Sequence, residues 1–323
     1  MEENVKVYSG AHGDVIRKFE MKNKRDIPFD SQEKNLRELV RYALEMAFND
    51  FNFRTLHKID AEEFERIFKE WKMKKQEKLR EMPPNERKDK EPSITKYLME
   101  RLGKPFEDRF ISYFTEVSME EAEFDRWHDE TCKMFLDNLN GDDGDKDHFP
   151  IYKDLKYGKA QKIVNMMFKH LYCFNSEEKW EIKWAPYFKY CHVTLDNFTL
   201  EWFKRNVSPY QRIDSWSNLE YLQDPEDKRG YLFYQKRIRN FFAEQPKNSV
   251  YGEVTPFQAE FYIWPEIQLR LAAEAFIQEL NPEDYKGKDT DPTKNRAGIR
   301  ELSMNELVAR VKHEIQKFEE KQS

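Results

Sequence analysis

The sequence predicts a mainly α-helical protein, with two packed helical subdomains, a cleft between them and little or no sheet. Only 10 glycines and 14 prolines occur among the 323 residues, and 36% of the residues are charged. A sandwich or a barrel needs many turn residues, so this composition favours helices. The apolar fraction is 39%, but 25 Phe, 16 Tyr and 7 Trp supply large side chains that can fill a core.

Sequence signals for helix starts predict two helices in the N-terminal part of the chain. A capping box begins at Asp30, and the apolar residues after it repeat at helical spacing, which predicts a helix over 31–49. A second helix starts at Asp60 and runs into a charged, proline-containing linker at 72–92. We therefore predict an N-terminal helical region over 1–92.

Two further helical regions are expected, a central one at 93–215 and a C-terminal one at 216–323. Residues that commonly cap helices recur through both regions and are followed by apolar residues at helical spacing. These predicted helix starts are Ser93, Ser118, Ser208, Asp224, Thr255 and Ser303.

The central region is the basic part of an acidic protein. Residues 151–215 contain eleven Lys or Arg against seven Asp or Glu, whereas the whole chain has a formal charge of −6. A helical pattern runs over 157–174, with Gly158 directly before Lys159 at its start. A glycine at this place lets another backbone approach, and the first-turn amides of a helix attract anions such as phosphate.

The predicted central helix has one apolar face. Helical spacing gathers Ile163, Met167 and other apolar residues on it. Lys162 and Lys169 fall on the opposite side, where a solvated face is expected. Lys159 lies at the edge between the two faces.

Asp196 precedes a second short helical pattern and has two interpretations. It can be an ordinary N-cap, whose carboxylate accepts amide hydrogen bonds. It can also be a carboxylate held at a helix N-terminus beside a lysine amine. Such a pair suits chemistry that builds positive charge on a sugar ring, where a lysine with a lowered pKa attacks the anomeric carbon.

The run Gly158-Lys159-Ala160-Gln161-Lys162-Ile163-Val164-Asn165-Met166-Met167, followed by Val193-Thr194-Leu195-Asp196, resembles part of the helix-hairpin-helix DNA glycosylases, the 8-oxoguanine group in particular. The resemblance implies that Lys159 is the nucleophile and that Asp196 is the supporting carboxylate. It also implies a modified or damaged base flipped out of duplex DNA into the interdomain cleft, in repair or in defence against phage, without a cofactor. The central run is similar as well to an uncharacterised bacterial family, which supplies no function.

The same resemblance implies further contacts with DNA. Aromatic side chains of the stretch before Asp196 would stack on the flipped base, and basic residues would meet the DNA backbone. The stacking residues are Trp184, Tyr187 and Tyr190. The backbone-binding set comprises Gly158, Lys162, Arg205, Arg212, Lys228, Arg229, Lys236 and Arg239.

A zinc site is a competing interpretation of the cysteines. Each of the three has a histidine near it, and a His and a Cys four residues apart on a helix can bind one ion together. The pairs are His128 with Cys132, His170 with Cys173, and His192 with Cys191. We expect instead reduced, buried thiols and no metal, because three cysteines make no disulfide framework and match no two-pair zinc spacing.

No apolar run in the sequence is long enough to span a bilayer, and the N-terminus lacks the apolar segment of a signal peptide. We therefore expect a cytoplasmic protein without a membrane partner. The alternative to the enzyme is a non-enzymatic, all-helical binding or interaction protein that uses the basic, aromatic central region.

Overall fold

The structure is a computed structural model. The part of the chain that it describes consists mainly of α-helices. An isolated bridge joins Glu220 and Gly230, and the described residues contain no sheet. The prediction of a mainly α-helical fold with little or no sheet is therefore confirmed. The described residues are 33–50, 61–87, 91–116, 120–140, 155–174, 185–208, 215–222, 224, 227, 230–247, 254–280 and 302–322.

The chain divides into two compact units, residues 1–260 and 261–323. The boundaries predicted after 92 and after 215 both fall inside the first unit. The division into three regions remains a prediction. No helix among the described residues is both long enough and apolar enough to cross a membrane.

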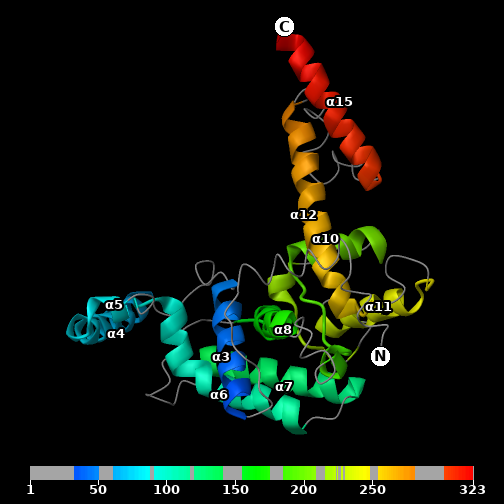
Figure 1. The fold of residues 1–323 in the computed structure, drawn as a ribbon. Coiled ribbons are helices and arrows are strands. Elements are labelled where there is room, and N and C mark those ends of the chain that lie inside the picture. The colour runs from blue at the N-terminus through cyan, green and yellow to red at the C-terminus, as the bar shows by residue number, and fades with distance from the viewer. Residues whose placement is uncertain are drawn as a thin grey trace. The chain divides into compact units, whose positions relative to one another are not determined.

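The centre of the first unit is α8 (Tyr157–Phe174), with α3 (Glu33–Asp50) and α7 (Glu121–Asn140) packed against it (Figure 1). A further long helix, α6 (Ile94–Glu116), packs against both α3 and α7. The helix predicted over 31–49 is thus confirmed as α3 to within two residues.

Aromatic side chains fill the space between α6, α7 and α8. The Phe168 ring on α8 lies 5.1 Å from Phe110 and 5.2 Å from Tyr113 of α6, and 5.5 Å from Phe124 of α7, between ring centroids. All four residues are buried. Aromatic residues therefore build this core where aliphatic ones are few, as the composition predicts.

Nearly the whole surface of α8 is buried, although the sequence pattern predicts a single buried face. Lys159 and Lys162 are half-buried, and every other residue of α8 whose side chain is described is buried. The prediction of a solvated Lys169 is wrong. Its Nζ lies 2.9 Å from Oε1 of Glu260, and the two side chains are only 6% and 1% exposed. This ion pair explains how a lysine can be buried on the side opposite the apolar face.

Two short helices pack together beyond α8. They are α10 (Asn197–Asn206) and α11 (Tyr231–Ala243), joined in the core by Trp202 stacking on Phe242 at 5.7 Å. The helix predicted from Asp224 begins only at Tyr231, whose N–H donates to the Glu220 carbonyl just ahead of the first turn.

The remaining elements among the described residues of the first unit are α4 (Ala61–Glu81), α5 (Pro84–Arg87) and two short 3-10 helices, η2 (Ala185–Phe188) and η3 (Trp216–Asn218). α4 packs against α6, where Trp71 meets Tyr97 edge to face with 5.3 Å between ring centroids. η3 packs against α8. This last contact shapes the site described below.

Two predicted helix starts are confirmed by their capping boxes. Thr255 exchanges hydrogen bonds with Gln258 ahead of α12 (Pro256–Leu280). Ser303 does the same with Glu306 ahead of α15 (Met304–Gln322). Both follow the reciprocal pattern in which each side chain accepts from the other's backbone N–H.

The second unit contains α15 and all but the first turn of α12. Ile277 of α12 and Leu307 of α15 are fully buried against each other. The Arg270 guanidinium also donates to the Leu302 carbonyl at 2.6 Å, just before α15.

Candidate functional site

The candidate site is organised by an extended segment, Val193–Asp196, whose backbone is held by side chains. Gln235 of α11 donates to the Val193 carbonyl at 2.8 Å and accepts from the Val193 N–H at 3.2 Å. Gln161 of α8 makes the same pair of bonds with Leu195, at 2.8 and 3.2 Å. Each glutamine side chain thus bonds the backbone N–H and carbonyl that a neighbouring strand would bond in a sheet.

The backbone groups of Thr194 in the same segment are also satisfied. Its N–H donates to Oε2 of Glu260 at 2.8 Å, and its carbonyl accepts from the Thr199 hydroxyl at 2.6 Å. A buried backbone without such partners would be costly, so these side chains fix the path of the chain into α10.

Asp196 is the N-cap of α10, which confirms its first interpretation. Its Oδ1 accepts from the Phe198 N–H at 2.9 Å and from the Thr199 N–H at 3.1 Å, and the Thr199 hydroxyl accepts from the Asp196 N–H. The geometry of the second interpretation is present too, because Oδ2 lies 3.9 Å from the Nζ of Lys162. The lysine placed beside this carboxylate is therefore Lys162, three residues after the predicted nucleophile.

Lys159 and Lys162, hereafter the amine pair, share one aromatic ring. Their Nζ atoms lie 4.4 and 4.9 Å from the centroid of Trp216 in η3. Burial, followed by the positive charge of Lys162, lowers the pKa of the Lys159 amine. A half-buried amine with a lowered pKa is a better nucleophile at neutral pH than an ordinary surface lysine.

Gly158 is close to another backbone, as predicted, and that backbone is the chain's own. A Cβ at this position would lie 1.8 Å from the carbonyl oxygen of Trp216. The Gly158 N–H donates to the Leu219 carbonyl at 3.0 Å, so it is not available to bind a phosphate.

The contacts of other residues in the predicted DNA-binding set do not involve the amine pair. Arg205 pairs with Glu201 one turn earlier on α10 at 2.8 Å, and Lys236 is exposed on α11. Arg239 binds the Asp125 carboxylate with two nitrogens, at 2.8 and 3.0 Å. Arg212, Lys228 and Arg229 lie outside the described residues. Contact of this set with DNA remains a prediction.

The predicted stacking residues take part in packing or lie outside the described residues. Tyr187 accepts a hydrogen bond from the Tyr113 hydroxyl through its carbonyl, and its ring lies 5.3 Å from Phe114. The Tyr190 carbonyl accepts from Arg239 at 3.2 Å. Trp184 is outside the described residues. A stacking role for these three residues remains a prediction.

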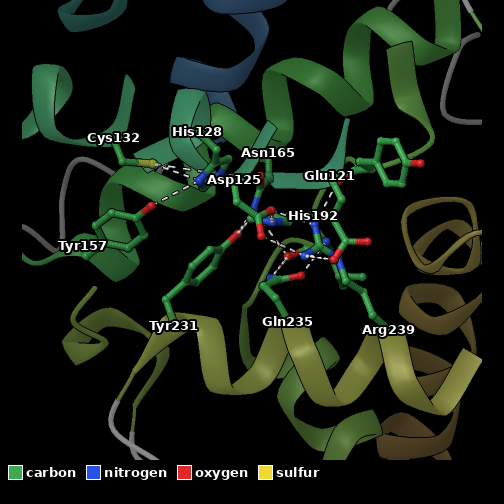
Figure 2. A network of polar contacts seen from close by, with 12 residues as sticks. Glu121, Asp125, His128, Cys132, Tyr157, Asn165, His192, Tyr231, Gln235 and Arg239 are labelled. Carbon is green, nitrogen blue, oxygen red and sulfur yellow. Dashed lines mark hydrogen bonds and ion pairs between the residues drawn. The ribbon is translucent and has the colours of Figure 1, made fainter. Parts of the chain in front are cut away.

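A network of polar side chains, most of them buried, is connected to Gln161 through the Asn165 amide (Figure 2). The His128 Nε2 lies 2.9 Å from Oδ1 of Asn165, and its Nδ1 lies 3.1 Å from the Tyr157 hydroxyl. The amide of Asn165 then donates to the Tyr231 hydroxyl at 3.0 Å. Because the amide oxygen only accepts, Nε2 of His128 carries the hydrogen and Nδ1 accepts from Tyr157.

The network continues from Tyr231 to the partly buried ion pair of Asp125 and Arg239. The Tyr231 hydroxyl lies 2.9 Å from Nδ1 of His192, whose Nε2 lies 2.8 Å from the Asp125 carboxylate. Burial lowers the pKa of His192 to about 4 in spite of Asp125. Burial alone would raise the pKa of Asp125, but hydrogen bonds from His192 and Arg239 outweigh it and hold that pKa well below its usual range.

The zinc interpretation finds no matching geometry. The nitrogens of His128 and His192 are occupied by the hydrogen bonds just given, and Nε2 of His170 lies 2.9 Å from Asp50. Within the described ranges no three His, Cys, Asp or Glu side chains are grouped so that they could hold a metal ion. None of the three cysteines forms a disulfide, and all three are buried.

Trp216 and Gln161 belong to the site but were not among the predicted residues. Trp216 lies 54 positions or more from the amine pair in the sequence, and its role follows from the contact between η3 and α8. Gln161 stands between the two lysines, and only its polar character inside a buried helix could have marked it.

Comparison with known proteins adds no relative. The sequence matches no family model, no curated protein and no solved structure. The resemblance to helix-hairpin-helix glycosylases therefore remains a prediction, and the site is interpreted from its own geometry.

Proposed function

We propose that the protein is a DNA glycosylase-like enzyme that cleaves the N-glycosidic bond of a modified or damaged base. The observation that supports this proposal is the amine pair against Trp216, with the Asp196 carboxylate 3.9 Å from one of the two amines. The amine with the lowered pKa is Lys159, and the fixed carboxylate lies beside its neighbour Lys162. A nucleophilic amine and a carboxylate at one site suit attack on a sugar carbon that gains positive charge.

In the proposed reaction Lys159 is the nucleophile. Its Nζ lone pair forms a bond to C1′ while the bond between C1′ and the base nitrogen breaks. The base leaves with that electron pair and takes up a proton, and the new ammonium loses one. Asp196 stabilises the charge that develops on the sugar, and the charge of Lys162 keeps the Lys159 amine neutral more often.

Trp216 contributes a surface on which both amines are held. Both Nζ atoms lie within about 6 Å of the ring centroid, where cation–π contact with an indole favours an ammonium, so in this proposal the ring holds the charged Lys162 and packs against the Lys159 amine. Buried cysteines without disulfides agree with a reducing compartment, and a cytoplasmic location is part of the proposal.

Borohydride trapping on duplex DNA that carries 8-oxoguanine or an abasic site tests this function. We expect the wild type to form a covalent adduct and Lys159→Met to lose it. Asp196→Asn should reduce adduct formation by about 10²-fold, because an asparagine keeps the helix cap but lacks the charge. Lys156→Met, at an exposed lysine just before α8, is the matched control.

The outcomes separate the assignments. An adduct that persists in Lys159→Met and disappears in Lys162→Met would move the nucleophile to Lys162. No adduct from the wild type on either DNA would contradict the glycosylase function.

A second candidate is a nucleic-acid-binding protein without catalysis. It is favoured by the capping role of Asp196, whose Oδ1 already accepts two backbone amides and so has a structural reason to be present. The amine pair would then contact phosphates, and binding would weaken steeply with salt. Fluorescence anisotropy with labelled DNA at low and high salt would show affinity lost in Lys159→Met, with no adduct from any variant.

A further inference from the structure

Gln161 lies on α8 between Lys159 and Lys162, and it is fully buried. Its Nε2 donates to the carbonyls of Gly158 at 2.9 Å and of Leu195 at 2.8 Å. Its Oε1 accepts from the Leu195 N–H at 3.2 Å.

A further bond to Oε1 comes from the Asn165 amide, at 2.9 Å. The side-chain amide of a glutamine has two hydrogens and two acceptor lone pairs. Gln161 uses all four, so hydrogen bonds fix the position of its side-chain amide.

The backbone groups that Gln161 holds belong to both sides of the candidate site. Gly158 directly precedes Lys159, and Leu195 directly precedes Asp196. One rigid amide therefore connects the first turn of α8 to the cap of α10. These two elements carry the amine pair and the carboxylate respectively.

We infer that Gln161 is a positioning residue that sets the placement of the amine pair relative to Asp196. This inference rests on the proposed function. It touches no reacting atom itself and acts through the backbone on either side. Loss of its bonds would leave the Leu195 N–H and carbonyl without their partner and let the cap shift against α8.

Gln235 supplies a matched control. It forms the same two bonds with Val193 in the same extended segment, but it comes from α11 and makes its pair two residues further from Asp196. It is also buried. A purely structural role for these glutamines predicts similar effects of replacing either one.

The experiment compares Gln161→Met with Gln235→Met at equal folded fraction, checked by circular dichroism. The first measurement is the rate of borohydride-trapped adduct on an oligonucleotide with an abasic site. We expect a fall of about tenfold or more in Gln161→Met and a fall at least about threefold smaller in Gln235→Met, since misplacement of a reacting group by a fraction of an ångström is costly and the bonds of Gln235 lie two residues further from Asp196.

The second measurement does not depend on any reaction with DNA. The pH dependence of reductive methylation of Lys159 and Lys162, followed by peptide mass spectrometry, reports the surroundings of each amine. We expect the profile of Lys159 or Lys162 to shift in Gln161→Met and to stay unchanged in Gln235→Met.

The outcomes are distinguishable. Equal effects of the two replacements in both measurements overturn the inference. A wild type that forms no adduct contradicts the proposed function, and the methylation profiles alone then decide the role of Gln161. If Gln161→Met does not fold, Gln161→Glu, which keeps the acceptor for Leu195 and Asn165, is compared with Gln235→Glu by the same two criteria.

Discussion

Gly158 has no room for a side chain. A Cβ there would lie 1.8 Å from the Trp216 carbonyl oxygen and 2.9 Å from the carbonyl carbon, and both are backbone atoms that a rotamer change cannot move. A glycine inside a helix costs about 1 kcal/mol relative to alanine. The close approach of η3 explains why α8 nevertheless has a glycine in its first turn.

Gly158→Ala should therefore destabilise the protein by at least about 2 kcal/mol, as expected for overpacking against backbone. Urea unfolding measures the change. The matched control is Gly103→Ala on α6, where the added Cβ would meet only ordinary contacts at 3.6 Å. That variant should gain about 0.5–1 kcal/mol, because alanine is the better helix former. Equal effects of the two replacements would contradict the steric explanation.

Local sequence rules predicted those site residues whose roles depend on neighbours within a few positions in the sequence. Gly158 and Asp196 were recognised because a glycine at a helix start and a capping carboxylate leave signals within a few positions. Lys169 was misplaced because its partner Glu260 is 91 positions away. Trp216 was missed for the same kind of reason, since pattern rules do not see contacts between distant segments.

At the scale of elements, α8 is a helix surrounded by others, and it carries a buried charge. Lys169 meets Glu260 from the first turns of α12, and the second oxygen of Glu260 accepts from the Thr194 N–H. Breaking a buried ion pair from one side leaves an uncompensated charge. Removing both charges can be much less harmful.

Lys169→Met should lower the free energy of unfolding by about 3–5 kcal/mol. Adding Glu260→Gln should recover more than half of that loss, because a glutamine oxygen still accepts from Thr194 and no charge is left unpaired. Lys133→Met is the control, since Lys133 is 56% exposed in its ion pair with Asp129 and should cost no more than about 1 kcal/mol. Urea unfolding of the four proteins measures these changes, and a double variant weaker than the single one would contradict the explanation.

The predicted helices with strong local signals were confirmed as elements, α3 and α15 among them. The apolar pattern of α8 gave the helix but not its surroundings, because periodicity shows one buried face and cannot show that polar residues of the other face are buried as pairs. The helix predicted from Asp224 starts late for a similar reason. The backbone there is bonded to Glu220, a contact outside the reach of capping rules.

At the scale of the whole molecule, the buried histidines make the stability of the first unit depend on pH. Burial lowers the pKa of His192 from 6.5 to about 4, and burial together with the nearby His192 places that of His128 well below its usual value. Both side chains are therefore neutral in the folded protein at pH values where the unfolded chain binds protons. As the pH falls, these histidines bind protons in the unfolded chain before they do so in the folded protein, which lowers the free energy of unfolding.

The free energy of unfolding should thus be highest above about pH 6.5 and should fall as the pH drops towards 4. His192 alone contributes up to about 3 kcal/mol of this fall, at about 1.4 kcal/mol per pKa unit. Urea unfolding at pH 7.5 and pH 5 measures it. His192→Gln should flatten the dependence, whereas His313→Gln, at an exposed position of α15, should leave it unchanged. Stability that is the same at both pH values would contradict this reasoning.

The global composition predicted the fold class, since scarce turn residues and many aromatic residues are properties of the whole chain. It did not predict the unit boundary at 260, which falls inside the continuous helix α12. A boundary of this kind changes neither the periodicity nor the charge of the sequence. Linker signals, by contrast, mark only places where a helix ends.

The extended segment Val193–Asp196 has a consequence for association between molecules. A strand at the edge of a sheet offers a row of unused N–H and carbonyl groups, and such rows recruit strands from other chains and start aggregation. Here side chains occupy those groups from both sides. The protein thus keeps this segment in its interior, where it leads into α10, without presenting an edge that another polypeptide could extend.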